Sequence, residues 1–160
     1  MERLQTYIGV IGPSDASPEV LRDAEEAGLC IARAGAVLVT GGGGGAMQAA
    51  CRGAKVGGGT TIGLLPGLSR GEGNPYLDIS IPTGMGEMRN VLVVRCSDAL
   101  LAVGGGFGTL SEIGLALKLD KPLAGIGTWQ ASLGDVTAPI PAAGSPALAL
   151  RILLQTLGDA

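Results

Sequence analysis

Residues 99–112 read ALLAVGGGFGTLSE, and this stretch decides the fold. An apolar run that breaks into glycines and then resumes with helical spacing predicts a buried strand, a tight loop and a helix. Glycines let backbone N–H groups approach a ligand closely, and the positive end of the helix dipole favours an anion at the same place. The stretch therefore predicts an anion pocket where the strand ends, with Thr109 as a cap or a hydroxyl donor and Glu112 in the first helical turn.

Short apolar runs alternate with helical patterns along the rest of the chain. Further strands are predicted at 7–11, 36–40, 61–65, 78–81 and 123–126, helices at 18–34, 46–57, 87–95 and 146–157, and loops at 67–76 and 127–144. Because most strands are continuous apolar runs, we expect a mostly parallel sheet flanked by helices, which is a Rossmann-like, doubly wound α/β fold. No linker or repeat interrupts the pattern, so one domain is expected over residues 1–160.

Composition restricts the partners and the chemistry. The net charge is -3 and basic runs are absent, which argues against nucleic acid. No apolar run approaches the roughly 20 residues of a membrane span, so membrane contact is not expected. The three cysteines are widely spaced and indicate free thiols in a reducing cytoplasm. The absence of histidine excludes a Ser-His-Asp triad, and no metal site is expected.

Two more loops follow predicted strands, namely GPSD at 12–15 and GGGGG at 41–45. Ligands bind at the carboxyl ends of parallel strands, so these loops should meet the glycines of residues 104–108 at one edge. Their spacing matches neither the dinucleotide fingerprint nor the Walker A loop, so NAD and ATP with magnesium are not expected. The predicted phosphate-binding residues are Gly12, Ser14, Thr40, Gly41, Gly42, Gly43, Gly44, Gly104, Gly105, Gly106, Gly108 and Thr109, together with Arg89 and Asn90.

Arg89 stands at the start of a predicted helix, where a cation is unfavourable for the dipole. It therefore needs an anion, which is either a carboxylate such as Glu87 or, as we expect, the phosphate or carboxylate of a ligand. Glu112 is either a solvated acid at a helix start or a carboxylate beside the ligand. The helix at 110–119 is apolar nearly all round, although one apolar face is enough to pack on the sheet. The remaining apolar surface predicts burial against another copy of the chain, in a homodimer or homotetramer.

The separation of Arg89 and Glu112 resembles that in the Lonely Guy phosphoribohydrolases, once mislabelled lysine decarboxylases. Those enzymes carry Met-His-x-Arg-Lys, an Ala-Asp-Ala strand and Pro-Gly-Gly-x-Gly-Thr-x-x-Glu. Residues 98–99 are in register between the arginine and the glutamate. The Met-His element is absent, Asn90 stands in place of the lysine, and Gly104 replaces the proline.

The whole chain is more similar to a sister branch, the molybdenum-cofactor carrier proteins. The matching stretches are TTIGLLPG at 60–67, GGGFGT at 104–109, EIGLALK at 112–118 and KP at 121–122, within a resemblance that covers residues 7–128. It implies a Rossmann-like protein that binds a small phosphorylated ligand, either a molybdopterin or a nucleotide monophosphate, without breaking a bond.

The Lonely Guy resemblance implies an alternative, an N-glycosidase that releases the base of nucleoside 5′-monophosphates and requires no cofactor. Glu112 would then be the catalytic carboxylate, and Arg89 would hold the phosphate or orient the sugar. A lysine decarboxylase is not expected, because nothing that flanks Lys55, Lys118 or Lys121 marks a pyridoxal phosphate site.

Overall fold

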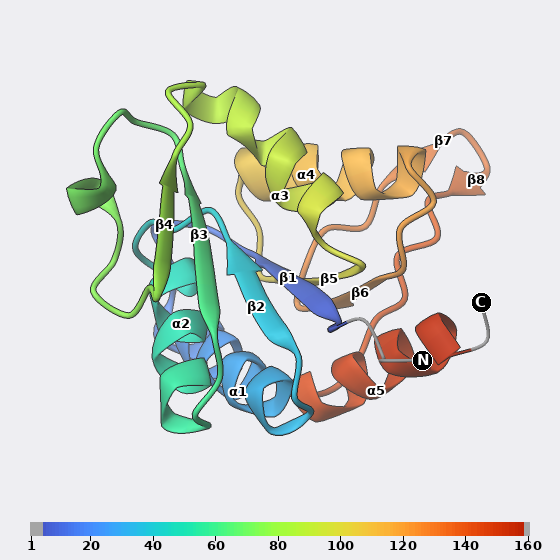
Figure 1. The fold of residues 1–160 in the computed structure, drawn as a ribbon. Helices are drawn as coiled ribbons and strands as arrows, with labels where there is room; N and C mark the ends of the chain where they lie inside the picture. The colour runs from blue at the N-terminus through green and yellow to red at the C-terminus, as the bar shows by residue number, and fades with distance from the viewer. Residues whose placement is uncertain (1–4, 159–160) are drawn as a thin grey trace.

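A six-stranded sheet runs through the centre of the computed structural model, which describes residues 5–158 (Figure 1). Its strands are β1 (Tyr7–Ile11), β2 (Val37–Thr40), β3 (Thr61–Leu65), β4 (Ile79–Pro82), β5 (Ala99–Val103) and β6 (Leu123–Ile126). They stand in the order β4-β3-β2-β1-β5-β6, and every neighbouring pair is parallel. All residues of β2 and β5 are buried, as expected for strands covered on both faces.

The order of the strands changes direction at β1. From β1 the chain adds β2, β3 and β4 on one side, and it later adds β5 and β6 on the other. Open α/β sheets bind ligands at such a switch point, outside the carboxyl ends of the strands. The loops that follow β1, β2 and β5 are neighbours there. The predicted Rossmann-like, doubly wound α/β fold is therefore confirmed.

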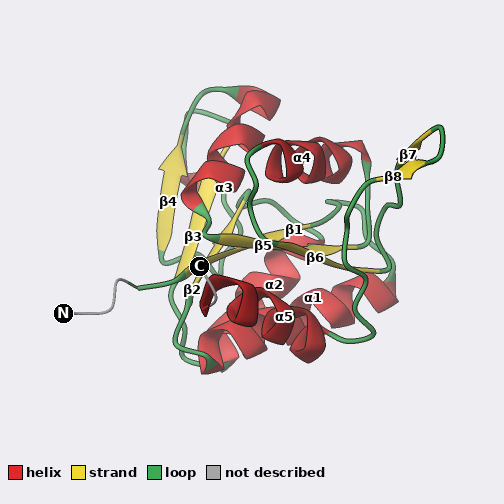
Figure 2. Ribbon diagram, turned by 90° about the vertical axis from the view of Figure 1, so that its right-hand side faces the viewer, coloured by secondary structure: helices red, strands yellow, loops and turns green. Residues whose placement is uncertain are grey.

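Helices cover both faces of the sheet (Figure 2). One face carries α1 (Pro18–Arg33), α2 (Ala46–Val56) and α5 (Pro146–Gly158), and the other carries α3 (Asn90–Cys96) and α4 (Phe107–Lys118). Ser17 caps α1 by accepting the N–H of Val20 at 3.3 Å. Helices α1 and α2 touch through Gly28, where a Cβ would lie 1.9 Å from the carbonyl oxygen of Ala50. None of the helices within residues 5–158 is both long and apolar enough to span a membrane.

Two segments expected to be loops contain short regular structure. Residues 127–144 include a hairpin of β7 (Ser132–Leu133) and β8 (Val136–Thr137). Residues 67–76 include the single 3₁₀ turn η1 (Arg70–Glu72). Both pieces are too short to produce a readable period in the sequence.

The start of α4 differs from the prediction. The helix begins at Phe107, so Glu112 lies in its second turn and not in its first. Gly106 is the N-cap residue, and its N–H donates to the hydroxyl of Thr109 at 3.4 Å. The helix dipole stabilises a negative charge only within the first turn. Glu112 is therefore not explained as an acid that the dipole at the helix start stabilises.

Candidate functional site

A cavity of about 430 Å³ opens beside the loops that follow β1 and β5, at the switch point of the sheet. Its volume lies within the usual range of small-molecule sites, about 300–1,000 Å³. The predicted residues that line it are Gly12, Ser14, Arg89, Asn90, Gly105, Gly106, Gly108, Thr109 and Glu112. The structure adds Pro13, Asp15, Met47, Glu87 and Phe107 to this lining.

The remaining predicted residues are absent from the lining of the cavity: Thr40, Gly41, Gly42, Gly43, Gly44 and Gly104. Thr40 is fully buried, and its hydroxyl accepts the N–H of Gly42 at 3.0 Å. At Gly41 a Cβ would lie 2.6 Å from Nη2 of Arg89, so this glycine leaves room for the guanidinium. Gly41 therefore supports the wall of the cavity from behind, and direct contact with a ligand stays a prediction for all six residues.

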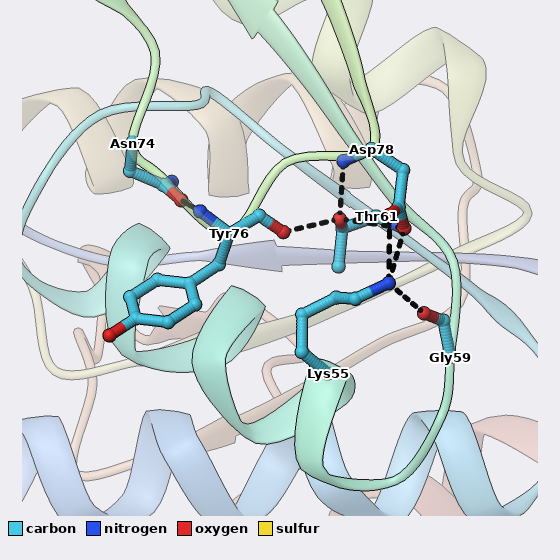
Figure 3. Close-up of polar contacts among 6 residues, drawn as sticks. All are labelled: Lys55, Gly59, Thr61, Asn74, Tyr76 and Asp78. Atoms are coloured by element: carbon cyan, nitrogen blue, oxygen red, sulfur yellow. Dashed lines mark hydrogen bonds and ion pairs between the residues drawn. The ribbon is translucent and has the colours of Figure 1, made fainter.

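Asn74, which sequence reasoning did not single out, holds this glycine loop in place. Its side-chain amide donates to the carbonyl of Gly43 at 3.1 Å and to that of Gly42 at 3.4 Å. Its backbone N–H also donates to Gly42, at 2.9 Å. Its Oδ1 accepts the N–H of Tyr76 at 3.0 Å, as Figure 3 shows. Asn74 therefore ties the segment before β4 to the loop after β2.

A second set of contacts fixes the segment that carries Asn74 (Figure 3). Thr61 donates its hydroxyl to the carbonyl of Tyr76 at 2.6 Å. Lys55, near the end of α2, reaches both carboxylate oxygens of Asp78 at 2.8 Å. Burial tends to raise the pKa of Asp78, but Lys55 and Thr61 together hold it below its ordinary value.

Arg89 is the cation of the cavity, at the end of the 3₁₀ turn η2 (Gly86–Arg89) that leads into α3. Its side chain is half-buried, and its Nε is enclosed without a hydrogen-bond partner. Among the residues that the structure describes, Arg89 forms no ion pair. Burial lowers its pKa, and the charges of Glu112 and Glu87 act in the opposite direction. A partly desolvated cation without an ion-pair partner is costly, and an anion in the cavity would offset that cost.

Asn90 connects Arg89 to helix α4. It is 9% exposed, and its Oδ1 accepts a hydrogen bond from Nη1 of Arg89. Its Nδ2 donates to the hydroxyl of Ser111 at 3.3 Å, and that hydroxyl donates to the carbonyl of Gly108 at 2.7 Å. This chain of contacts joins the start of α3 to the start of α4, which brings Arg89 and Glu112 to one cavity.

Glu112 is a buried carboxyl group, 6% exposed, on the wall of the same cavity. Burial raises its pKa to about 7, although the charge of Arg89 acts to lower it. Within residues 5–158 its carboxylate has no hydrogen-bond partner. A carboxyl group with a pKa near neutrality is able to act as a general acid or base.

The N-terminus of α4 borders the cavity, because Gly106, Phe107 and Gly108 all line it. The first N–H groups of a helix have no partner within the helix, and no side chain caps α4 from outside. Such a terminus favours an anion. Over the described part of the chain, no three His, Cys, Asp or Glu side chains are grouped so that they would hold a metal ion.

The fold and the cavity define a Rossmann-like α/β protein with a cavity at the switch point of its sheet. The chain belongs to the SLOG cluster4 family, whose model matches residues 5–141. Among its relatives, an uncharacterised protein of Archaeoglobus fulgidus is 47% identical over 119 residues, which are 74% of this chain and 78% of that protein. The cytokinin riboside 5′-monophosphate phosphoribohydrolase of Mycobacterium tuberculosis is 36% identical over 127 residues, 71% of this chain and 67% of that enzyme.

Solved structures resemble the chain over almost its whole length. The molybdenum cofactor binding protein of Rippkaea orientalis superposes with a TM-score of 0.88 at 35% identity, covering 98% of this chain and 99% of that one. The molybdenum cofactor carrier protein of Chlamydomonas reinhardtii gives a TM-score of 0.83 at 37% identity, covering 96% and 99%. The expected membership of the superfamily of carriers and phosphoribohydrolases is thereby confirmed.

Proposed function

We propose that the chain binds a phosphate-bearing small molecule, either a molybdopterin-type cofactor or a nucleotide, and holds it as a carrier. The observation that carries this proposal is Arg89, a half-buried cation without an ion-pair partner among residues 5–158. Phosphate oxygens would accept hydrogen bonds from its guanidinium and from the free N–H groups at the start of α4. The likeness to the molybdenum cofactor binding protein of Rippkaea orientalis and to the molybdenum cofactor carrier protein of Chlamydomonas reinhardtii supports this function.

Titration calorimetry with matched ligands tests the role of the phosphate. Molybdopterin and a panel of nucleoside 5′-monophosphates are each compared with the same compound after its phosphate has been removed. Loss of charge-assisted hydrogen bonds is worth about 1.5–3 kcal/mol, so the dephosphorylated compound should bind about 10-fold or more weakly. Equal affinity within such a pair, or no binding across the panel, would show that the cavity does not recognise phosphate.

Glu112 favours a second candidate, hydrolysis of nucleoside 5′-monophosphates to a free base and ribose 5-phosphate. The bond between the sugar and the base breaks through a cation-like transition state, the base leaves with a proton, and water adds to the sugar. A carboxylate beside the sugar would stabilise that cation or take the proton from the attacking water. The likeness to the Mycobacterium tuberculosis phosphoribohydrolase supports this reading.

Base release, followed by chromatography, separates the two candidates. If the chain is a hydrolase, Glu112→Gln should lower the rate about 10²-fold or more, the scale of positioned general acid–base catalysis. Glu72→Gln, an exposed carboxyl group outside the cavity lining, is the control. Unchanged turnover in Glu112→Gln would remove this carboxyl group from the mechanism, and ligand binding without base release would favour the carrier.

Assembly and location are further parts of the proposal. Four leucines of the α4 region are half-buried: Leu110, Leu115, Leu117 and Leu119. They support a homodimer or homotetramer, and a monomeric mass in light scattering at micromolar concentration would exclude it. The cysteines are free thiols, which supports a reducing cytoplasm as the location.

A further inference from the structure

Phe107 is an exposed aromatic residue on the wall of the cavity. The chain has only one Phe, one Trp and two Tyr, and this Phe is 82% exposed at the first position of α4. Large apolar side chains are usually buried. A ring that stands almost uncovered beside a ligand cavity therefore has a surface available for contact.

The ring of Phe107 is held in place from one side. It stacks on Trp129 with 5.9 Å between the ring centroids and 29° between the planes. The indole N–H of Trp129 donates to the carbonyl of Gly106 at 3.1 Å, which fixes the indole against the glycine turn. Gly105 leaves space for the indole, since a Cβ at Gly105 would lie 2.5 Å from Nε1 of Trp129. Phe107 is therefore a preorganised aromatic surface.

The cavity combines this surface with the polar groups described above. Pro13 and Met47 add further apolar lining, while Arg89 and the start of α4 provide the positive groups. Glu112 lies five residues beyond Phe107, about 7.5 Å along the helix axis. All three residues line the same cavity, so a ligand that spans it contacts Phe107 with one part and the pair of Arg89 and Glu112 with another.

We propose that the uncovered surface of Phe107 stacks against a planar heteroaromatic ring of the ligand. This inference rests on the proposed function and adds the residue that recognises the planar ring, which both proposed ligand classes carry together with a phosphate. Aromatic side chains stack on such rings with little dependence on the identity of the ring. Phe107 is then the residue that selects ring-bearing phosphates over simple sugar phosphates.

Calorimetry with three probes tests the inference. Adenosine 5′-monophosphate and neopterin monophosphate carry a ring and a phosphate, and ribose 5-phosphate carries the phosphate without a ring. Phe107→Leu should lower the affinity for at least one ring-bearing probe about 10-fold, the usual loss for a removed stacking partner. Its affinity for ribose 5-phosphate should stay within about twofold of the wild-type value. Phe107→Tyr retains an aromatic ring and should restore the affinity. The ring-bearing probe that responds identifies a nucleotide or a pterin as the ligand.

Trp129 provides an independent signal, because it is the chain's one tryptophan and it stacks on Phe107. Its fluorescence should change when the responsive ring-bearing probe binds, and it should not change with ribose 5-phosphate. Ring-bearing probes that bind no more tightly than ribose 5-phosphate, or that lose nothing in Phe107→Leu, overturn the inference and leave the phosphate site intact. If none of the three probes binds, and molybdopterin and the other nucleoside 5′-monophosphates do not bind either, the proposed function itself fails.

A second copy of the chain is the competing occupant of this exposed surface. Phe107→Leu would then lower the mass measured by light scattering, and it would weaken all three probes together. That result would assign Phe107 to assembly and overturn the inference. An unchanged mass, with a loss confined to ring-bearing probes, supports it.

Discussion

Replacing Glu112 by glutamine should stabilise the fold in a pH-dependent way. Burial raises the pKa of Glu112 from the ordinary value of 4.5 to about 7. Because the folded pKa lies above the unfolded one, folding takes up a proton between these values, and wild-type stability falls as the pH rises through 7. At about 1.4 kcal/mol for each tenfold change in proton affinity, the full cost is about 3 kcal/mol. Glutamine stays neutral at both pH values, so Glu112→Gln does not have this loss of stability.

Urea unfolding at pH 5 and pH 8 measures this effect. Glu112→Gln should exceed the wild type by about 3 kcal/mol at pH 8 and by about 1 kcal/mol or less at pH 5. Gly114→Ala is the matched control on the same helix, because its Cβ would meet open space. It should add about 0.5–1 kcal/mol at both pH values. An equal gain for Glu112→Gln at both pH values, or a loss at pH 8, would refute the reasoning about this carboxyl group.

Two further variants test the support behind the cavity. Gly41→Ala places a Cβ 2.6 Å from Nη2 of Arg89, so it should displace the guanidinium and weaken ligand binding about 10-fold or more in calorimetry. Gly114→Ala, whose Cβ meets open space outside the cavity lining, should bind normally. Equal affinities in the two variants would exclude this role for Gly41. Asn74→Ala removes the donor to the Gly43 carbonyl and leaves the Gly42 carbonyl with the backbone N–H alone, so it should lower the free energy of unfolding by about 1–3 kcal/mol. An unchanged urea midpoint would show that the side chain of Asn74 does not stabilise the loop.

The sheet and the edge that carries the cavity were predictable from the sequence, because continuous apolar runs such as 99–103 belong to strands buried on both faces. The start of α4 was not predictable in the same way. Its cap is Gly106, which offers no side-chain oxygen, and its first residues include Gly108, a poor helix former. Sequence propensity therefore placed the helix start too late and Glu112 too early in the helix.

The residues of the candidate site also differ in whether a local sequence signal reveals their role. Arg89 stood out because a cation at a helix start is locally unfavourable, and that signal needs no knowledge of distant contacts. The role of Asn74 depends on carbonyl groups 31 and 32 residues away, which only the folded chain brings near. Phe107 lies within the glycine motif, but its exposure and its stacking on Trp129 follow from tertiary packing.

The affinity of Arg89→Met for a phosphorylated ligand tests the proposed site most directly. Arg95→Met is the control, since Arg95 is an exposed arginine in the last turn of α3, the helix that Arg89 precedes. With the molybdopterin or nucleoside monophosphate that binds the wild type, Arg89→Met should bind about 10-fold or more weakly, and Arg95→Met should bind as the wild type does. If the two variants bind with the same affinity, Arg89 does not hold the phosphate, and the cavity is not the site proposed here.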